Sequence, residues 1–209
     1  YFANDVNAST LEEAIVGADV FLGLSKGNIL SAKMVQTMAP NPIVFACANP
    51  DPEISYELAI KSREDIILAT GRSDHPNQVN NVIGFPFIFR GAMDVNATGI
   101  NEEMKIAAVK AIAALAKEPV PEEVSKAYNL KNLVFGKEYI IPKPTDPRLI
   151  SIVAPAVAKA AMDSGIAQKP IKNWETYKQD LISRMGYDST LMQQVTLRAK
   201  QNPKKVVCG

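Results

Sequence analysis

Three short apolar runs constrain the fold more than any other feature of this sequence. They cover residues 20–24, 43–48 and 66–69, and each is continuous rather than alternating. Continuous runs of this length are typical of parallel strands buried on both faces. Segments with helical spacing lie around them, at 11–17, 31–39 and 56–62, and Thr10 and Ser31 stand at the expected N-cap positions of the first two. The alternation predicts an α/β protein with a doubly wound parallel sheet.

The strand ends indicate where a ligand would bind, because open α/β sheets bind ligands beyond the carboxyl ends of their strands. Ser25 and Lys26 follow the first run, Asn49 follows the second, and Asn80 and Asn81 come between the third and an apolar helix expected from residue 82. An Asn amide does not titrate and offers both donors and acceptors. A helix N-terminus beside it would add free N–H groups. For any single Asn a cap or turn role is the alternative, and for Lys26 a solvated loop lysine.

Composition narrows the class of protein and of partner. The chain has 209 residues, is 47% apolar and carries a net charge of +1, which indicates a globular protein without a broad nucleic-acid or anionic-membrane footprint. We see no apolar run of about 20 residues and no signal peptide. The two cysteines, Cys47 and Cys208, form neither a disulfide framework nor a zinc pattern. We therefore expect a cytoplasmic protein that binds no membrane and no nucleic acid.

The second half predicts helices joined by irregular connections. Helical stripes cover 101–115, with Asn101 near the cap, 149–164, with Pro155 expected to kink the helix or begin a new first turn, and 174–185. Residues 139–144 are expected to be extended, and a further helix is expected at 191–200. The chain begins with Tyr1 rather than Met and stops as an apolar run begins, so we expect a fragment.

Long motifs in a fixed order carry a family resemblance. FACANPDPE (45–53), ATGRSDHPNQVNNVIGFPFIFRGAMDV (69–95) and FGKEYIIPKPTDPRLISIVAPAVAKAAMDSGIA (135–167) occur in succession. Together they resemble bacterial NADP-dependent malic enzymes of the large form, and the likeness covers nearly the whole chain. It implies that 1–125 is the C-terminal part of a Rossmann-like NAD(P)-binding domain. It further implies that 126–185 is a helical and extended tail packing on a catalytic domain, and that 186–209 begins a phosphate-acetyltransferase-like domain; a frayed terminus is the alternative for this last segment.

The resemblance also implies an activity and roles for particular residues. Malic enzymes oxidise (S)-malate and decarboxylate it to pyruvate and CO2, with NADP+ or NAD+ and Mg2+ or Mn2+. By this likeness Asn49 would meet a ribose hydroxyl at the nicotinamide end of the cofactor, and Ser25 would touch its ribose or phosphate. Asn81 would hold a malate carboxylate, with Asn80 as the weaker candidate. NADP is favoured over NAD, and a homo-oligomer is expected for the full-length protein.

The same resemblance implies what this chain does not supply. The acid–base Tyr and Lys, the acidic metal ligands and the G-x-G-x-x-G turn are expected in sequence before Tyr1, so we expect no catalytic residue, no metal ligand and no turnover by the fragment alone. His75, the single histidine, lies in a polar loop without a recognisable orienting partner and is not assigned to catalysis. Two alternatives stay open: a non-catalytic binding or assembly module built on an incomplete nucleotide fold, and another dehydrogenase such as an amino-acid dehydrogenase.

Overall fold

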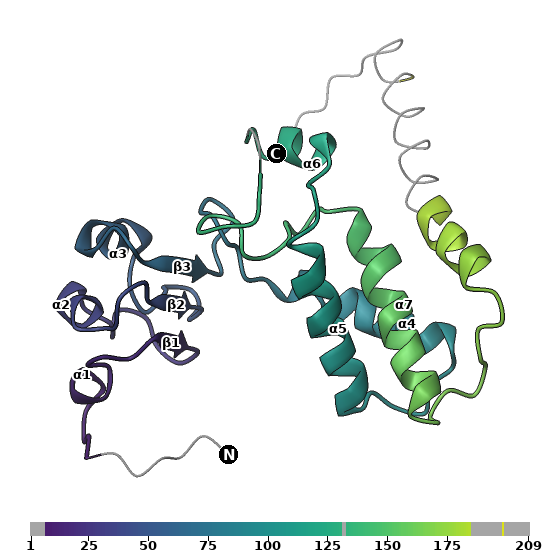
Figure 1. Cartoon of the computed structure of the whole chain (residues 1–209), viewed down its shortest axis with the longest axis horizontal. Coiled ribbons are helices and arrows are strands. Elements are labelled where there is room, and N and C mark those ends of the chain that lie inside the picture. The colour runs from purple at the N-terminus through teal and green to yellow at the C-terminus, as the bar shows by residue number, and fades with distance from the viewer. Residues whose placement is uncertain (1–6, 131–132, 185–197, 199–209) are drawn as a thin grey trace, which may run out of the picture. The chain divides into compact units, whose positions relative to one another are not determined.

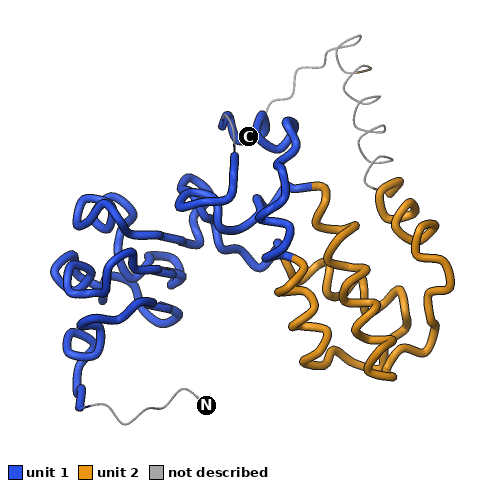
Figure 2. The backbone as a smooth tube through the Cα atoms, viewed as in Figure 1, with its two compact units in different colours: residues 1–83, 112–146 blue, residues 84–111, 147–209 orange. Residues whose placement is uncertain are grey.

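The chain divides into two compact units. The computed structural model describes residues 7–130, 133–184 and 198. One unit comprises residues 1–83 and 112–146, and the other 84–111 and 147–209 (Figure 2). These units reflect packing and are not continuous in sequence, so the boundaries at 125 and 185 stay predictions. The predicted helix 191–200, except Arg198, and the predicted domain start at 186–209 lie outside the described residues.

The first unit contains the parallel sheet that the apolar runs predict. Its strands are β1 (Val20–Gly23), β2 (Ile43–Ala46) and β3 (Ile67–Thr70), in the order β1-β2-β3 and all parallel (Figure 1). At the carboxyl ends Gly23 pairs with Ala46, and Ala46 pairs with Thr70. The three strand tips are therefore level, and the loops that follow them meet at one edge of the sheet.

Three short helices accompany the strands, each begun by a hydroxyl cap. They are α1 (Leu11–Ala14), α2 (Ala32–Gln36) and α3 (Tyr56–Ser62). The side chains of Thr10, Ser31 and Ser55 accept N–H groups of the first turns, which satisfies donors left open at a helix start. Helices and strands enclose one apolar core: Ile15, Phe21, Leu30, Met34, Val35, Met38, Val44, Ala46, Ile54, Ala59, Ile66 and Leu68.

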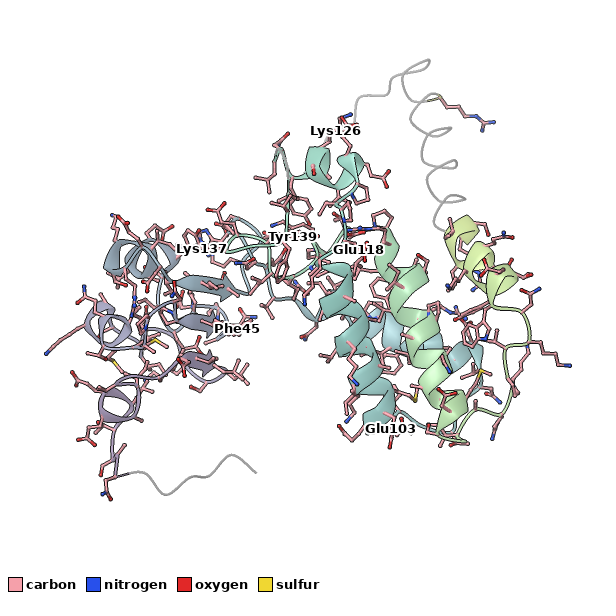
Figure 3. The ribbon with its side chains drawn as sticks, viewed as in Figure 1. Phe45, Glu103, Glu118, Lys126, Lys137 and Tyr139 are labelled. Carbon is pink, nitrogen blue, oxygen red and sulfur yellow. The ribbon has the colours of Figure 1, made fainter. Side chains whose placement is uncertain are left out.

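The sheet has an open edge and an apolar face that this core does not use. Val20 and Leu22 are exposed on β1, whereas Phe21 between them is buried. Leu22 is in register with Phe45 of β2, labelled in Figure 3, so both side chains lie on the face opposite the core. Among the described residues β1 pairs with β2 alone. One edge of this strand therefore keeps free backbone hydrogen-bonding groups.

The connection between β3 and the next helix differs from the prediction. A helix was expected from residue 82, but Asn81–Ile83 forms a single 3-10 turn (η1), and α4 runs over Phe85–Asp94 with Gly84 as a cap that has no side-chain hydrogen bond. The cause is local, because the Asn80 side chain accepts the Val82 N–H at 3.0 Å and the Asn80 carbonyl accepts the Ile83 N–H at 3.1 Å. The prediction that a helix N-terminus lies directly beside the two asparagines is therefore wrong.

The second unit is helical. Its main contact joins α4 to α7 (Arg148–Asp163), where Gly91 allows a close approach: a Cβ on it would lie 2.5 Å from the Ala154 carbonyl oxygen and 2.8 Å from the Val157 Cβ. Helix α7 continues through Pro155 and ends before Gly165, which has φ +76. The predicted new first turn at Pro155 is therefore absent.

The helix at 174–184 is tied to α4 by one polar network. The Tyr177 hydroxyl donates to Asp94 Oδ2 at 2.7 Å, and Arg90 pairs with the same carboxylate from one turn earlier on α4. Burial raises the pKa of Tyr177, so its hydroxyl stays a donor at neutral pH. Asp94 thus has a structural role within this unit.

The remaining helices are α5 (Glu102–Leu115) and α6 (Glu122–Ala127). Asn101 accepts the Met104 N–H at 3.1 Å, which confirms the predicted cap, whereas α6 was not predicted. None of the described helices is long and apolar enough to cross a membrane.

Candidate functional site

A cavity of about 380 Å³ lies at the carboxyl ends of β2 and β3. Three predicted site residues line it, namely Asn49, Asn80 and Asn81. Asn49 follows β2 through Cys47 and Ala48, and Asn80 and Asn81 arrive from the segment after β3. The structure thus brings together amides that are about 30 positions apart, at the sheet edge where a doubly wound fold binds ligands.

The three amides differ in how far they are already engaged. Asn80 accepts the Val82 N–H and shapes the 3-10 turn. The side chains of Asn49 and Asn81 are exposed and make no hydrogen bond to any other described residue. Their donors and acceptors are therefore available to a ligand.

Arg72 is the one charged residue among the described residues that line this cavity. Its Nε and Nη2 donate to the two carboxylate oxygens of Asp74, at 2.9 and 2.7 Å. The hydrogen bond from Arg72 lowers the pKa of Asp74 to about 2, so the pair is ionised at neutral pH. A cation therefore accompanies the amides, and the sequence analysis did not assign it.

A buried carboxyl group holds the strand tips beneath the cavity. Glu53 has no exposed surface, and it accepts the Ser25 N–H at 3.3 Å and the Ala48 N–H at 3.0 Å. Gly23 makes room for it, because a Cβ at that position would overlap the Glu53 carboxyl group. This single side chain links the end of β1 to the end of β2. A glycine inside a strand pattern was the sequence signal for such a close approach.

The environment of Cys47 disfavours a nucleophilic role. Burial raises the pKa of its thiol, and the nearby Glu53 carboxylate raises it further. The reactive form of cysteine is the thiolate, which this site disfavours.

Ser25 lies close to this cavity without lining it. Its backbone N–H shares Glu53 with Ala48, which places it at the neighbouring strand tip, but neither Ser25 nor Lys26 is among the lining residues. The structure therefore groups Asn49 with Asn80 and Asn81 and leaves Ser25 one strand away.

Asn77 has a structural role that a turn residue would not need. It is 2% exposed and has φ +53, and its Nδ2 donates to the Leu68 and Lys137 carbonyls at 3.0 and 2.8 Å. Its Oδ1 accepts the Ile140 N–H at 2.9 Å. The segment 137–140, with Lys137 and Tyr139 labelled in Figure 3, is thereby attached to β3.

A larger cavity of about 530 Å³ lies beyond Asn77 and contains none of the three amides. Lys143 lines it, is 4% exposed, and has a pKa lowered by burial, with its Nζ 5.1 Å from the centre of the Tyr128 ring. His75 also lines it and does have an orienting partner, because its ring stacks on Tyr56 at 4.4 Å. The 380 Å³ cavity remains the better candidate because its polar groups converge at the strand tips.

Among the described residues no group of three or more His, Cys, Asp or Glu side chains is arranged to hold a metal ion. Asp74 and Asp94 are each engaged by an arginine. We assign no metal ligand to the described part of the chain.

Residues 2–133 match the protein-family model for the NAD binding domain of malic enzyme. The chain belongs to the malic enzyme family. It is 54% identical to an NADP-dependent malic enzyme of Rhizobium meliloti over 98% of this chain and 27% of that protein. A second malic enzyme, the NADP-dependent protein of Halomonas elongata, is 59% identical over 81% of this chain and 40% of its own length.

A solved malic enzyme supports the same fold. The crystal structure from Pyrococcus horikoshii aligns with a TM-score of 0.74 and 36% identity, over 91% of this chain and 40% of that one. The chain therefore spans between about a quarter and two fifths of the malic enzymes it matches. The predicted family and the Rossmann-like α/β fold class are both confirmed.

Proposed function

We propose that the complete protein is an NADP-dependent malic enzyme, to which this chain contributes the substrate amides and part of the cofactor crevice. The reaction is the oxidative decarboxylation of (S)-malate to pyruvate and CO2. The observation that carries the proposal is the convergence of Asn49, Asn80 and Asn81 on one cavity at the strand tips. Membership of the malic enzyme family supports the reaction class.

The amides fit a dinucleotide and a hydroxy acid without competing for protons. Asn49 would bond a ribose hydroxyl near the nicotinamide, and Ser25 would meet the cofactor from the tip of β1. Asn81 would donate through Nδ2 to a carboxylate of malate. NADP+, when bound, would supply the hydride acceptor. The groups that move protons are expected outside this chain.

The divalent cation belongs to the proposal for the complete protein only. No described residue is assigned to it. A cytoplasmic location and a homo-oligomeric assembly complete the proposal, and the names of the bacterial relatives favour NADP over NAD.

The first test is turnover by the full-length protein. It should reduce NADP+ on addition of malate and Mn2+, followed as absorbance of the reduced nicotinamide, and chelation of the metal should stop the reaction. A protein that binds nucleotide without oxidising malate would instead be a non-catalytic binding module.

The second test assigns the amides. Asn81→Ala should raise the KM for malate by about tenfold or more, since a hydrogen bond to a charged group contributes about 1.5–3 kcal/mol. Asn81→Asp should raise it further, because it places a like charge beside the carboxylate. Asn80→Ala serves as the matched control with a smaller effect, and Asn49→Ala should raise the cofactor KM instead. Unchanged malate kinetics in Asn81→Ala would remove that residue from the site.

A further inference from the structure

Arg72 lies between two cavities and is only partly engaged. It lines the 380 Å³ cavity with Asn49 and Asn81, and it also lines a smaller cavity of about 250 Å³ together with Asp74. Its side chain is 54% exposed despite the pairing with Asp74. The guanidinium therefore borders the space in which the amides would hold a ligand.

Some N–H donors of the Arg72 guanidinium remain available to a ligand. Arginine has five N–H donors, and Asp74 takes one from Nε and one from Nη2. Nη1 makes no hydrogen bond to any other described residue. Asp74 thus fixes the plane of the group while leaving donors for a second acceptor, and arginine suits carboxylates because its donors match their geometry.

The charge of the ligand favours such a group. A dicarboxylate brings two negative charges, and the amides of Asn49, Asn80 and Asn81 supply hydrogen bonds but no positive charge. Among the described lining residues Arg72 alone supplies one. Its pairing with Asp74 also stabilises the cation when no ligand is bound.

We propose that Arg72 binds one carboxylate of the dicarboxylic substrate while Asn81 holds the other, with Asp74 acting as a positioning residue that orients the guanidinium. The inference rests on the proposed function for the identity of the substrate. It adds a residue that sets specificity for two carboxylates over one.

The kinetic test uses Arg72→Gln and Asp74→Asn in the full-length protein. Arg72→Gln should raise the malate KM by about tenfold or more while the cofactor KM stays within about twofold, as expected when charge-assisted hydrogen bonds to substrate are lost. Arg72→Lys should restore only part of this, because a lysine keeps the charge without the fork. Asp74→Asn should give a smaller rise. Lys61→Gln, an exposed basic position on α3 away from both cavities, is the matched control and should change neither KM.

A pair of inhibitors separates this role from a structural one. Tartronate carries two carboxylates and lactate carries one. Arg72→Gln should weaken inhibition by tartronate by about tenfold and leave inhibition by lactate unchanged. An equal loss for both inhibitors, or an unchanged malate KM, would overturn the proposal.

Calorimetry of L-malate binding to the full-length protein and to Arg72→Gln distinguishes failure of the role proposed for Arg72 from failure of the proposed function. Malate that binds without being oxidised, and binds more weakly in Arg72→Gln, would overturn the reaction and keep the site. Malate that is oxidised equally well by both proteins would overturn the role of Arg72 and keep the reaction. A protein that neither binds nor oxidises malate would overturn both.

Discussion

Glu53 sets the positions of two proposed cofactor-binding residues without touching the cavity surface itself. Its carboxyl oxygens accept the N–H groups of Ser25 and Ala48, and Ala48 directly precedes Asn49. These two hydrogen bonds form a bracket between the ends of β1 and β2. Loss of the bracket should therefore disturb both strand tips at once, although the sequence of neither tip changes.

Glu53→Gln tests the bracket. The amide retains one acceptor oxygen and turns an NH2 group toward a backbone N–H, so one donor loses its partner, at a cost of about 1–3 kcal/mol. Hydrogen exchange at residues 24–26 and 47–49 of the full-length protein should become about tenfold faster or more. Glu57→Gln, exposed on α3, is the control and should leave these amides unchanged. Equal protection in Glu53→Gln and wild type would show that the bracket does not hold the tips.

The contrast between Asn81 and Glu53 shows which residues a sequence reveals. Asn49, Asn80 and Asn81 were predicted as candidates because polar groups after buried strands mark a ligand edge. Glu53, Arg72 and Asn77 act through partners 28, 2 and as many as 63 positions away, respectively. Nothing in the local pattern around Glu53 or Asn77 distinguishes a buried, fully bonded side chain from a loop residue.

At the scale of elements, the contact of α4 with α7 depends on the missing side chain of Gly91. Gly91→Ala sets two effects against each other, since alanine favours a helix by about 1 kcal/mol whereas overpacking costs about 1–3 kcal/mol. A Cβ at 2.5 Å from a backbone oxygen cannot be relieved by a rotamer change, so overpacking should prevail. We expect a lower unfolding midpoint in denaturant.

Met93→Ala is the comparison for this substitution. Met93 lies on the same helix and is 69% exposed, so its truncation should change the free energy of unfolding by no more than about 0.5 kcal/mol. A Gly91→Ala protein more stable than wild type would mean that helix propensity, not contact with α7, governs this position.

Elements were predictable where one local signal sufficed. The strands, the caps at Thr10, Ser31 and Asn101, and the end of α7 at Gly165 follow from short patterns. The start of α4 was misplaced because the Asn80 side chain takes the Val82 N–H and diverts the chain into a 3-10 turn. Helix α6 was missed because its six residues give too short a pattern to show a period.

At the scale of the molecule, the open edge of β1 and its apolar face determine how the isolated chain should behave. Val20, Leu22 and Leu24 are 53%, 61% and 72% exposed, beside free backbone groups. Such an edge promotes association. Leu22→Lys should therefore lower the average mass of the 209-residue chain in solution, measured by light scattering after size-exclusion chromatography.

In the full-length protein, Leu22→Lys should be destabilising rather than beneficial. If the rest of that protein covers this face, a lysine there buries a charge and lowers the thermal midpoint. Val16→Lys, at a 63% exposed position outside the sheet, controls for the added charge. It should change neither the average mass of the 209-residue chain nor the thermal midpoint of the full-length protein. A full-length protein indifferent to Leu22→Lys would show that the face stays open to solvent.

The hydrogen bonds of Asn77 have a practical consequence for dividing this protein into smaller pieces. The family match ends at residue 133, yet two of the three hydrogen bonds of the Asn77 side chain join it to Lys137 and Ile140. A domain truncated at that boundary would leave the Asn77 side chain with one of its three partners, the Leu68 carbonyl of β3. A nucleotide-binding piece intended for crystallisation or binding studies should therefore extend past residue 140.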